Sequence, residues 1–289
     1  MQSTKYFASH DGTQIWCGTV GEGPAMVLCD GFACDGFIWP YVIDHFCDHF
    51  QIVRWHYRGH GRSDTPEDFS RLSIEDLCKD LEAVLDALEI EEAILLGHSM
   101  GAQVILQSYE SFPERIRALI PVCGTYARPL DTFKNTDLLA RALPYLEKMA
   151  NAAPNVFQGI WNTVVNTQLS YMLAHLTELN AALVNGEDFR PYLEHTAMMN
   201  VQVYVTMLHH LAEHSAEHIL PTIEVPTLVV ASEFDSFTPL DRSQAMHEMI
   251  AGSDMIILPG ASHAGPIELP DTVIGAIEKF LIQHDLWPE

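Results

Sequence analysis

The stretch "AILLGHSMGAQVILQ", residues 93–107, decides the expected fold. It starts with apolar residues, places Ser99 between Gly97 and Gly101, and continues with residues that favour a helix. A serine on a sharp turn from a buried strand into a helix is lifted above the sheet, and the cramped backbone around it tolerates only small residues. The stretch therefore predicts a strand, a tight turn and a helix that together expose the Ser99 hydroxyl.

Short apolar runs repeat the strand part of this pattern along the chain. They cover residues 25–31, 51–55, 93–99, 118–124, 227–232 and 255–260. Continuous apolarity of this length is typical of strands buried on both faces of a parallel sheet. Helical patterns separate the runs, most clearly at 73–90, behind a Ser73-x-x-Asp76 start signal, and at 271–284. The alternation predicts an α/β fold with a doubly wound, mostly parallel sheet.

Two further segments complete the expected organisation. Residues 5–21 alternate around Asp11-Gly12, which predicts an antiparallel hairpin at the sheet edge. Residues 125–220 show only helical patterns, with apolar positions that include Trp161, Tyr171 and Tyr204. We therefore expect a core domain built from residues 1–124 and 221–289, interrupted by a helical insertion at 125–220.

Composition narrows the classes of partner. The 289 residues are 48% hydrophobic, enough to fill the core of one large domain. The formal net charge of −24 would repel a phosphate backbone and an anionic bilayer, so we expect neither nucleic acid nor membrane as a partner. The six cysteines lack C-x-x-C spacing, which indicates reduced thiols and no zinc or disulfide framework. With no signal-peptide pattern and no apolar window of membrane-spanning length, a cytoplasmic protein is expected.

A serine hydroxyl is a weak nucleophile unless a general base takes its proton and an acid orients that base. On this fold the expected order along the chain is serine, acid, histidine. The run at 227–232 is followed by Glu233 and Asp235, and the run at 255–260 is followed by His263. These positions lie just beyond the carboxyl ends of predicted parallel strands, where open α/β sheets gather their sites.

Acyl transfer also places negative charge on the carbonyl oxygen of the substrate, which calls for two backbone N–H donors. The Met100 amide is one candidate, because it opens the predicted helix after Ser99. The second candidate is the amide of Phe32, in the loop after the run at 25–31, where Gly31 lets the backbone turn.

These motifs resemble those of the α/β-hydrolase superfamily, in particular its capped branch of esterases, cofactor-free haloperoxidase-like enzymes and carbon–carbon bond hydrolases. The matching stretches are "GEGPAMVLCDGF" (21–32), "YRGHGRSD" (57–64), "GHSMGA" (97–102), "VPTLVVASEFDSFTP" (225–239) and "LPGASHAGP" (258–266). The resemblance implies Ser99 as nucleophile, Asp235 as acid and His263 as base. It also implies an oxyanion hole from the Phe32 and Met100 amides, a cap formed by the helical insertion, and no cofactor.

The sequence departs from the family pattern at two positions. Asp30-Gly31 stands where relatives commonly have His-Gly, and His56 stands where an acidic residue is frequent. The stretch "RGHGRS" usually serves architecture in such proteins, so Arg58, His60 and Arg62 are assigned no chemistry. Branches that use an aspartate nucleophile are disfavoured, because Ser99 occupies the turn.

The expected activity is hydrolysis of a small-molecule, mainly apolar carboxylic ester through an acyl-enzyme. The same catalytic set also serves carbon–carbon hydrolases, lactonases, thioesterases and perhydrolases, and the sequence leaves these options and the oligomeric state open. A non-catalytic ligand receptor is an alternative of another class, because fold does not fix function. A second alternative is a zinc site at "HLAEH", where His210 and His214 would share a helix face with His218 and Glu213 would act as base.

Overall fold

The strands form one sheet in the computed structural model, which describes residues 3–131, 138–165, 167, 180, 182–183 and 186–288. In this described part, eight strands are arranged in the order β1-β2-β4-β3-β5-β6-β7-β8. Their bounds are β1 (Ser3–Ala8), β2 (Gln14–Val20), β3 (Ala25–Cys29), β4 (Gln51–Trp55), β5 (Ala93–His98), β6 (Ile116–Val122), β7 (Leu228–Ser232) and β8 (Asp254–Leu258). β3 to β8 pair in parallel, whereas β1 and β2 form an antiparallel hairpin at the edge. The predicted strands, hairpin and mostly parallel sheet are confirmed.

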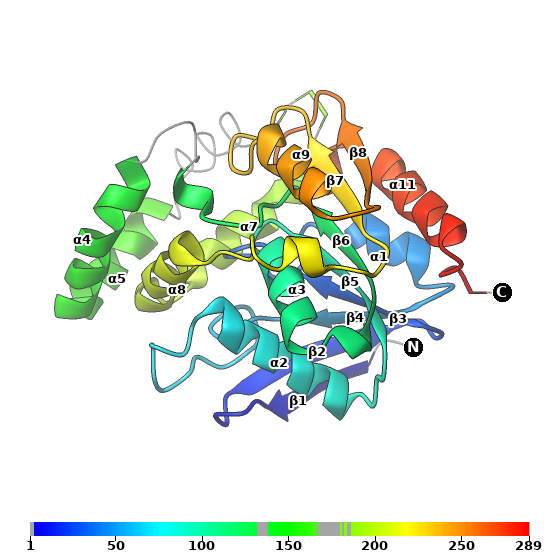
Figure 1. Cartoon of the computed structure of the whole chain (residues 1–289). Coiled ribbons are helices and arrows are strands. Elements are labelled where there is room, and N and C mark those ends of the chain that lie inside the picture. Colours follow the sequence, from blue (N-terminus) through cyan, green and yellow to red (C-terminus); the bar gives the residue numbers. More distant parts are fainter. Residues whose placement is uncertain are drawn as a thin grey trace.

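Helices cover both faces of this sheet (Figure 1). Alternate residues of β3 face opposite sides: Val27 belongs to one hydrophobic cluster, Met26 and Leu28 to the other. The first cluster includes residues of α2 (Ile74–Ala87), α3 (Met100–Ser111) and α9 (Leu240–Met249), and the second includes residues of α1 (Pro40–Phe46) and α11 (Pro270–Gln283). The fold is therefore a doubly wound α/β sandwich, as predicted.

The two helices predicted most clearly are present. α2 begins with a capping box in which Ser73 Oγ accepts a hydrogen bond from the Asp76 amide at 3.3 Å, and the Asp76 carboxylate accepts one from the Ser73 amide at 3.4 Å. α11 buries Val273, Ile277 and Phe280 against the second cluster. The spacing of apolar residues therefore predicted which helix faces are buried.

One strand differs from expectation. The run at 255–260 was predicted to be buried on both faces, yet most of β8 is partly exposed and only Leu258 is buried. The reason is that β8 lies at the edge of the sheet, next to β7 alone. Its apolar residues consequently leave Ile257 41% exposed.

The chain between β6 and β7 is helical wherever it is described in regular elements. It contains α4 (Leu138–Ala152), α5 (Pro154–Val165), α7 (Gly186–Met198) and α8 (Val201–Glu213). α4 contacts α5 and α8, α5 also contacts α7, and the group lies to one side of the sheet (Figure 1). Tyr171, one of the apolar positions expected in this segment, lies outside the described residues. The same segment holds the short helices η2 (Pro129–Asp131) and η4 (Leu220–Thr222), and the short helices η1 (Pro113–Arg115) and α10 (Gly265–Glu268) lie outside it.

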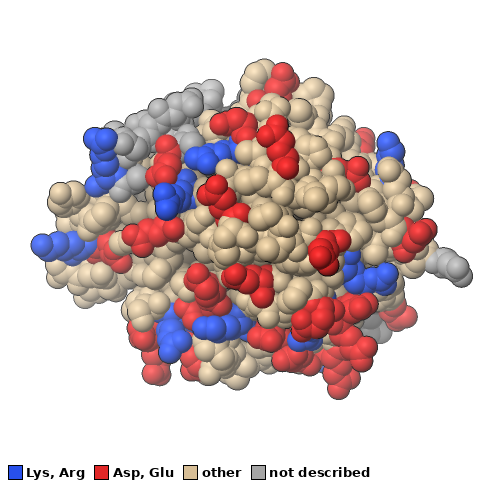
Figure 2. All heavy atoms as spheres, in the orientation of Figure 1, with Lys and Arg blue, Asp and Glu red and all other residues tan. Residues whose placement is uncertain are grey.

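The surface reflects the acidic composition. Figure 2 shows Asp and Glu spread over the drawn face, with fewer Lys and Arg among them, consistent with 39 acidic and 15 basic residues. Within the described ranges, no helix combines the length and apolarity needed to cross a bilayer.

Candidate active site

Ser99 sits on the tight turn between β5 and α3. Its backbone has φ 55° and ψ −116°, a left-handed φ that non-glycine residues rarely adopt. A Cβ atom on Gly97 would lie 2.3 Å from the Gly101 carbonyl oxygen, and one on Gly101 would lie 2.3 Å from the Cys29 carbonyl oxygen. Both contacts are far inside van der Waals distance, so the turn requires glycine on each side of Ser99.

Three side chains from separate strand ends form a continuous hydrogen-bonded relay. Ser99 Oγ, after β5, lies 2.9 Å from His263 Nε2, after β8. His263 Nδ1 lies 2.8 Å from Asp235 Oδ2, after β7. Of the two acids after β7, Asp235 therefore contacts the imidazole, whereas the exposed Glu233 accepts a hydrogen bond from the Gly260 amide at 2.8 Å.

Asp235 is buried and its carboxylate is fully engaged. Oδ1 accepts hydrogen bonds from the Phe237 and Thr238 amides, each at 2.8 Å, and Oδ2 accepts one from Thr238 Oγ1 at 2.8 Å. Burial raises the pKa of Asp235, but the charge of His263 and the hydrogen bonds from His263 and Thr238 outweigh it and hold the pKa below its ordinary 3.8. An ionised Asp235 requires the hydrogen on His263 Nδ1, which leaves Nε2 free to accept the proton of Ser99.

Two aromatic neighbours fix the His263 ring, and the sequence motifs did not single out either. The Phe237 ring stacks on the imidazole, with centroids 4.8 Å apart and planes at 22°. His98 Nε2 donates a hydrogen bond to the His263 carbonyl at 3.0 Å. Burial lowers the pKa of His98 to about 3, so this imidazole is neutral and acts as a fixed donor. Only the tertiary fold brings together these rings, from the end of β5 and from the loops after β7 and β8.

Glu268 is a further residue that the sequence motifs did not indicate. It is buried in α10, five residues after His263, and accepts hydrogen bonds from the Ser262 amide and hydroxyl, each at 2.6 Å. The same carboxylate accepts a hydrogen bond from the Asn180 amide at 2.7 Å. Glu268 thus ties the loop that carries His263 to the segment between β6 and β7.

The loop predicted to supply an oxyanion amide passes next to Ser99. A Cβ atom on Gly31 would lie 3.2 Å from Ser99 Cβ, so glycine permits this approach. The Ala33 amide donates a hydrogen bond to His60 Nε2 at 3.2 Å, which holds the loop from the side of the "RGHGRS" segment. Phe32 lines the same cavity as Ser99, and Met100 opens α3 directly after it. The roles of the Phe32 and Met100 amides stay predictions.

Asp30 and His56, the two residues that depart from the family pattern, are both buried and hydrogen-bonded. Asp30 Oδ1 accepts a hydrogen bond from Trp39 Nε1 at 2.9 Å, and burial raises the pKa of Asp30 to about 7 against the opposing charge of Arg54. His56 Nδ1 accepts a hydrogen bond from the Arg62 amide at 2.9 Å, and burial lowers the pKa of His56 to about 3. Both residues brace loops near the site and neither joins the relay.

Arg58, the other residue of "RGHGRS" assigned to architecture, is completely buried. Its guanidinium forms ion pairs with Asp80 at 2.6 Å and Asp11 at 2.8 Å. These pairs join the hairpin loop, the "RGHGRS" loop and α2 behind the site, which is a structural role.

The relay opens into a cavity of about 390 Å³. Its wall is mainly apolar and aromatic: Phe32, Phe37, Pro129, Leu130, Leu139, Trp161, Val165, Phe189, Tyr192, Leu193, Tyr204, Leu208, Leu211, Phe237 and Ala264. The remaining wall residues in the described part of the chain are Cys34, His98, Ser99, Thr196, Thr238 and His263. None of these described wall residues is Asp, Glu, Lys or Arg, so the cavity suits an uncharged, apolar ligand.

The zinc alternative depends on the prediction that His210, His214 and His218 share a helix face, and that prediction is wrong. α8 ends at Glu213, and His214 turns away with ψ 142°, so His210, His214 and His218 do not share a helix face. His214 Nε2 instead lies 3.0 Å from Gln107 Oε1, and His218 Nε2 lies 2.9 Å from Glu110 Oε1. Across the described residues, no group of three or more His, Cys, Asp or Glu side chains is arranged to hold a metal ion.

Comparison with known proteins assigns the family. Residues 24–270 match the model of the alpha/beta hydrolase fold, which covers most of the chain. The chain belongs to the α/β hydrolase fold family. The superfamily and the α/β-hydrolase class of enzyme predicted from the sequence are thereby confirmed.

Three similar proteins are each less than a quarter identical to this chain. The karrikin insensitive 2 receptor CA of Petunia hybrida is 23% identical over 280 residues, covering 92% of this chain and 95% of the receptor. Mouse bifunctional epoxide hydrolase 2 is 23% identical over 304 residues, covering 96% of this chain but only 55% of its own length. Among solved structures, a thermophilic esterase from Thermogutta terrifontis matches with a TM-score of 0.80 at 20% identity, covering 98% of this chain and 99% of the esterase.

Proposed function

We propose that this α/β hydrolase cleaves a mainly apolar carboxylic ester through a covalent acyl-enzyme on Ser99. The observation that carries the proposal is the relay from Ser99 through His263 to Asp235, with distances of 2.9 and 2.8 Å, at the wall of an apolar cavity. A nucleophile, a base and an orienting acid in hydrogen-bond contact are the minimum set for nucleophilic acyl transfer.

In the proposed mechanism, His263 Nε2 takes the proton of Ser99 as the hydroxyl oxygen attacks the ester carbonyl. Asp235 keeps the hydrogen on Nδ1 and stabilises the imidazolium that forms. The Phe32 and Met100 amides would donate to the oxyanion, and His263 would then return the proton to the departing alcohol. A water molecule, deprotonated by His263, releases the carboxylic acid from Ser99 and completes the cycle.

The cavity supports an ester with an apolar acyl or alcohol group. Aromatic rings such as Trp161, Tyr204 and Phe237 offer dispersion contacts, whereas no described wall residue offers an opposite charge to an ionic substrate. We also infer that residues 125–220 act as a cap, since Trp161, Tyr192 and Leu208 of its helices line the cavity opposite Ser99 and His263. Cap packing would then set which ester is accepted.

A panel of p-nitrophenyl esters of increasing acyl length tests this proposal. The wild-type protein should hydrolyse short and medium esters, and activity should fall once the acyl chain exceeds the cavity. Ser99→Ala should lower kcat by about ten-thousandfold or more on every ester. The matched control is Ser111→Ala on the same helix, whose exposed side chain is remote from the relay and should leave kcat unchanged. Full turnover by Ser99→Ala would end the proposal.

One relative favours a second candidate function, that of a ligand receptor. The karrikin insensitive 2 receptor CA matches this chain over almost its whole length. A receptor would bind its ligand in the same cavity with negligible turnover. A fluorophosphonate probe separates the two functions when it is combined with the ester panel: rapid labelling of Ser99 together with multiple turnovers supports the hydrolase, whereas ligand binding without turnover supports the receptor.

A further inference from the structure

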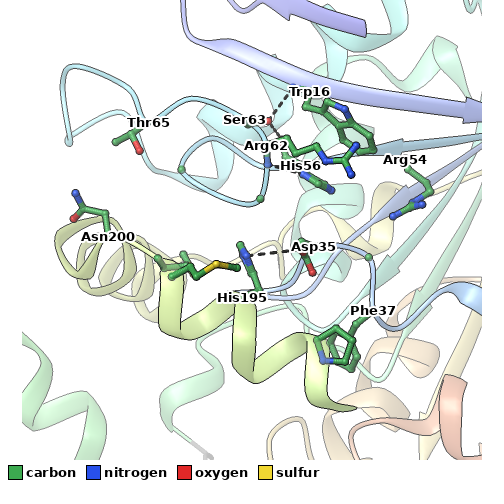
Figure 3. Close-up of a pocket in the computed structure, with 16 residues that line it drawn as sticks. Trp16, Asp35, Phe37, Arg54, His56, Arg62, Ser63, Thr65, His195 and Asn200 are labelled. Carbon is green, nitrogen blue, oxygen red and sulfur yellow. Dashed lines mark hydrogen bonds and ion pairs between the residues drawn. The ribbon is translucent and has the colours of Figure 1, made fainter. Parts of the chain in front are cut away.

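A second cavity, here called the arginine cleft, lies on the other side of Phe37 from the relay. It measures about 740 Å³ and is drawn in Figure 3. Its walls are Trp16, Asp35, Gly36, Phe37, Arg54, His56, Gly59, Gly61, Arg62, Ser63, Thr65, Pro191, His195, Met198, Met199 and Asn200. Phe37 lines both cavities, whereas Ser99, Asp235 and His263 do not line this one. The arginine cleft is therefore a separate site, assembled from β2, β4, two loops and α7.

Two guanidinium groups stand in this cleft without a carboxylate partner. Arg54 and Arg62 form no ion pair with any described residue, whereas Arg58, Arg71 and Arg115 all do. Instead, the Arg62 guanidinium lies 4.9 Å from the centroid of the Trp16 ring and that of Arg54 lies 5.9 Å from it. The charge of Arg54 also acts on the buried Asp30, which does not line the cleft. The two guanidinium groups leave room for an anion from outside the chain.

His56, which lines the same cleft, carries a buried N–H hydrogen-bond donor. Because its Nδ1 accepts the hydrogen bond from the Arg62 amide, the neutral ring carries its hydrogen on Nε2. His56 is 5% exposed, and its Nε2, like Nε of Arg54, is buried with no hydrogen-bond partner among the described residues. Two buried nitrogens that lack a partner in the described structure thus belong to residues that line the cleft beside the Arg62 guanidinium.

The one carboxylate in the cleft is turned toward an imidazole. Asp35 Oδ2 lies 3.8 Å from His195 Nδ1, and Figure 3 shows these two side chains facing Arg62 and His56 across the cleft. Asp35 carries one negative charge and would weaken anion binding. Arg54 and Arg62 carry two positive charges, so positive charge outnumbers negative charge on the cleft wall. Trp16, Phe37, Pro191 and Met198 supply apolar surface beside the charges. A ligand that fits needs an anionic group and an apolar body.

We propose that the arginine cleft binds a small organic anion with an apolar body, whose acid group lies between Arg54 and Arg62. Carboxylates and phosphate monoesters share this chemistry, because a guanidinium offers paired N–H donors to either. The site is independent of the proposed ester hydrolysis, since none of the relay residues contributes to it.

Isothermal titration calorimetry with sodium benzoate, phenyl phosphate and neutral benzyl alcohol tests the site on the full-length protein. At least one of the two anions should bind, benzyl alcohol should not displace it, and the anion that binds more tightly identifies the acid group. Arg62→Gln, an exposed position, and Arg54→Gln should each weaken anion binding about tenfold. The matched control Arg117→Gln removes one exposed positive charge outside the cleft and should leave binding unchanged.

A gain-of-affinity variant completes the test. Asp35→Asn removes the carboxylate from the cleft and should strengthen anion binding severalfold. Thermal unfolding of each variant shows whether the variant is folded. If Arg54→Gln does not fold, Arg62→Gln alone still tests the site. Failure of both anions to bind, displacement of the bound anion by benzyl alcohol, or affinity that Arg62→Gln leaves intact would overturn the proposal.

Discussion

The cavity that holds Ser99 and the arginine cleft share Phe37 as a wall residue, but they differ in how their polar groups are paired. In the cavity that holds Ser99 and His263, polar groups are few and the relay is complete: Asp235, behind the wall, receives hydrogen bonds from Phe237, Thr238 and His263. In the arginine cleft, polar and charged groups are many, and Arg54 and His56 keep buried donors without a partner in the described structure.

This difference suits the cavity with the relay to a reaction and the arginine cleft to the binding of a ligand. A relay whose hydrogen bonds are already formed is prepared for a reaction, because little reorganisation is needed when charge develops. Donors without acceptors are prepared for a ligand that brings the acceptors. Variants of the relay and of the loop that carries His263 should therefore change catalysis and spare anion binding, and a variant that changed both would break the comparison.

The largest effect is expected from His263→Ala. Removal of the proposed general base should lower kcat for p-nitrophenyl acetate by about ten-thousandfold, because Ser99 would then keep its proton. Benzoate binding to the arginine cleft, measured by calorimetry, should not change. His284→Ala is the matched control, since its imidazole pairs with Asp254 at 3.0 Å away from both cavities. If kcat of His263→Ala fell by less than tenfold, His263 would not be the general base.

Asp235→Asn should have the next largest effect, lowering kcat about a thousandfold with little change in KM. The amide can donate a hydrogen to His263 Nδ1, which favours the tautomer with its hydrogen on Nε2 and blocks proton transfer from Ser99. Steady-state kinetics beside Asp254→Asn, at a partly exposed position, makes the comparison. Equal kinetics in the two variants would show that Asp235 does not orient the base.

Asp30 lies between the two regions and should make stability depend on pH. Its folded pKa of about 7 exceeds its ordinary 3.8, so folding favours the protonated form and the associated stability is lost as pH rises from about 4 to about 7. Asp30→Asn does not titrate and still accepts the Trp39 hydrogen bond. Relative to wild type, its free energy of unfolding should rise by about 2 kcal/mol between pH 5.5 and pH 8, measured by urea denaturation. A difference that is flat with pH would contradict this.

Glu268→Gln should give the smallest effect, lowering kcat about tenfold while the melting temperature changes little. One carboxylate oxygen becomes an NH₂ group that faces the Ser262 or Asn180 N–H, so the loop before His263 loses part of its support. Glu278→Gln is the control at a partly exposed position paired with His45. Unchanged kcat in Glu268→Gln would assign that residue to stability alone, and altered benzoate binding would break the separation of the cavities.

Local sequence predicted the parts of the fold that depend on neighbouring residues. The strand, turn and helix around Ser99 follow from glycines that no larger residue can replace, since a Cβ on either would meet a carbonyl oxygen at 2.3 Å. The same local reasoning failed at the "HLAEH" segment, because tertiary contacts of His214 and His218 end α8 at Glu213. It also failed for β8, whose exposure depends on its position in the sheet order.

The sequence by itself determined the α/β fold, the turn that presents Ser99, and the order in which candidate acids and the histidine follow it, because backbone sterics and apolar spacing act over a few residues. Only the tertiary structure selected Asp235 over Glu233, joined Glu268 to Asn180, and brought Arg54 and Arg62 to one cleft with Trp16 and His195. Those contacts join separate segments of the chain, and their distances follow from how the sheet and its loops pack.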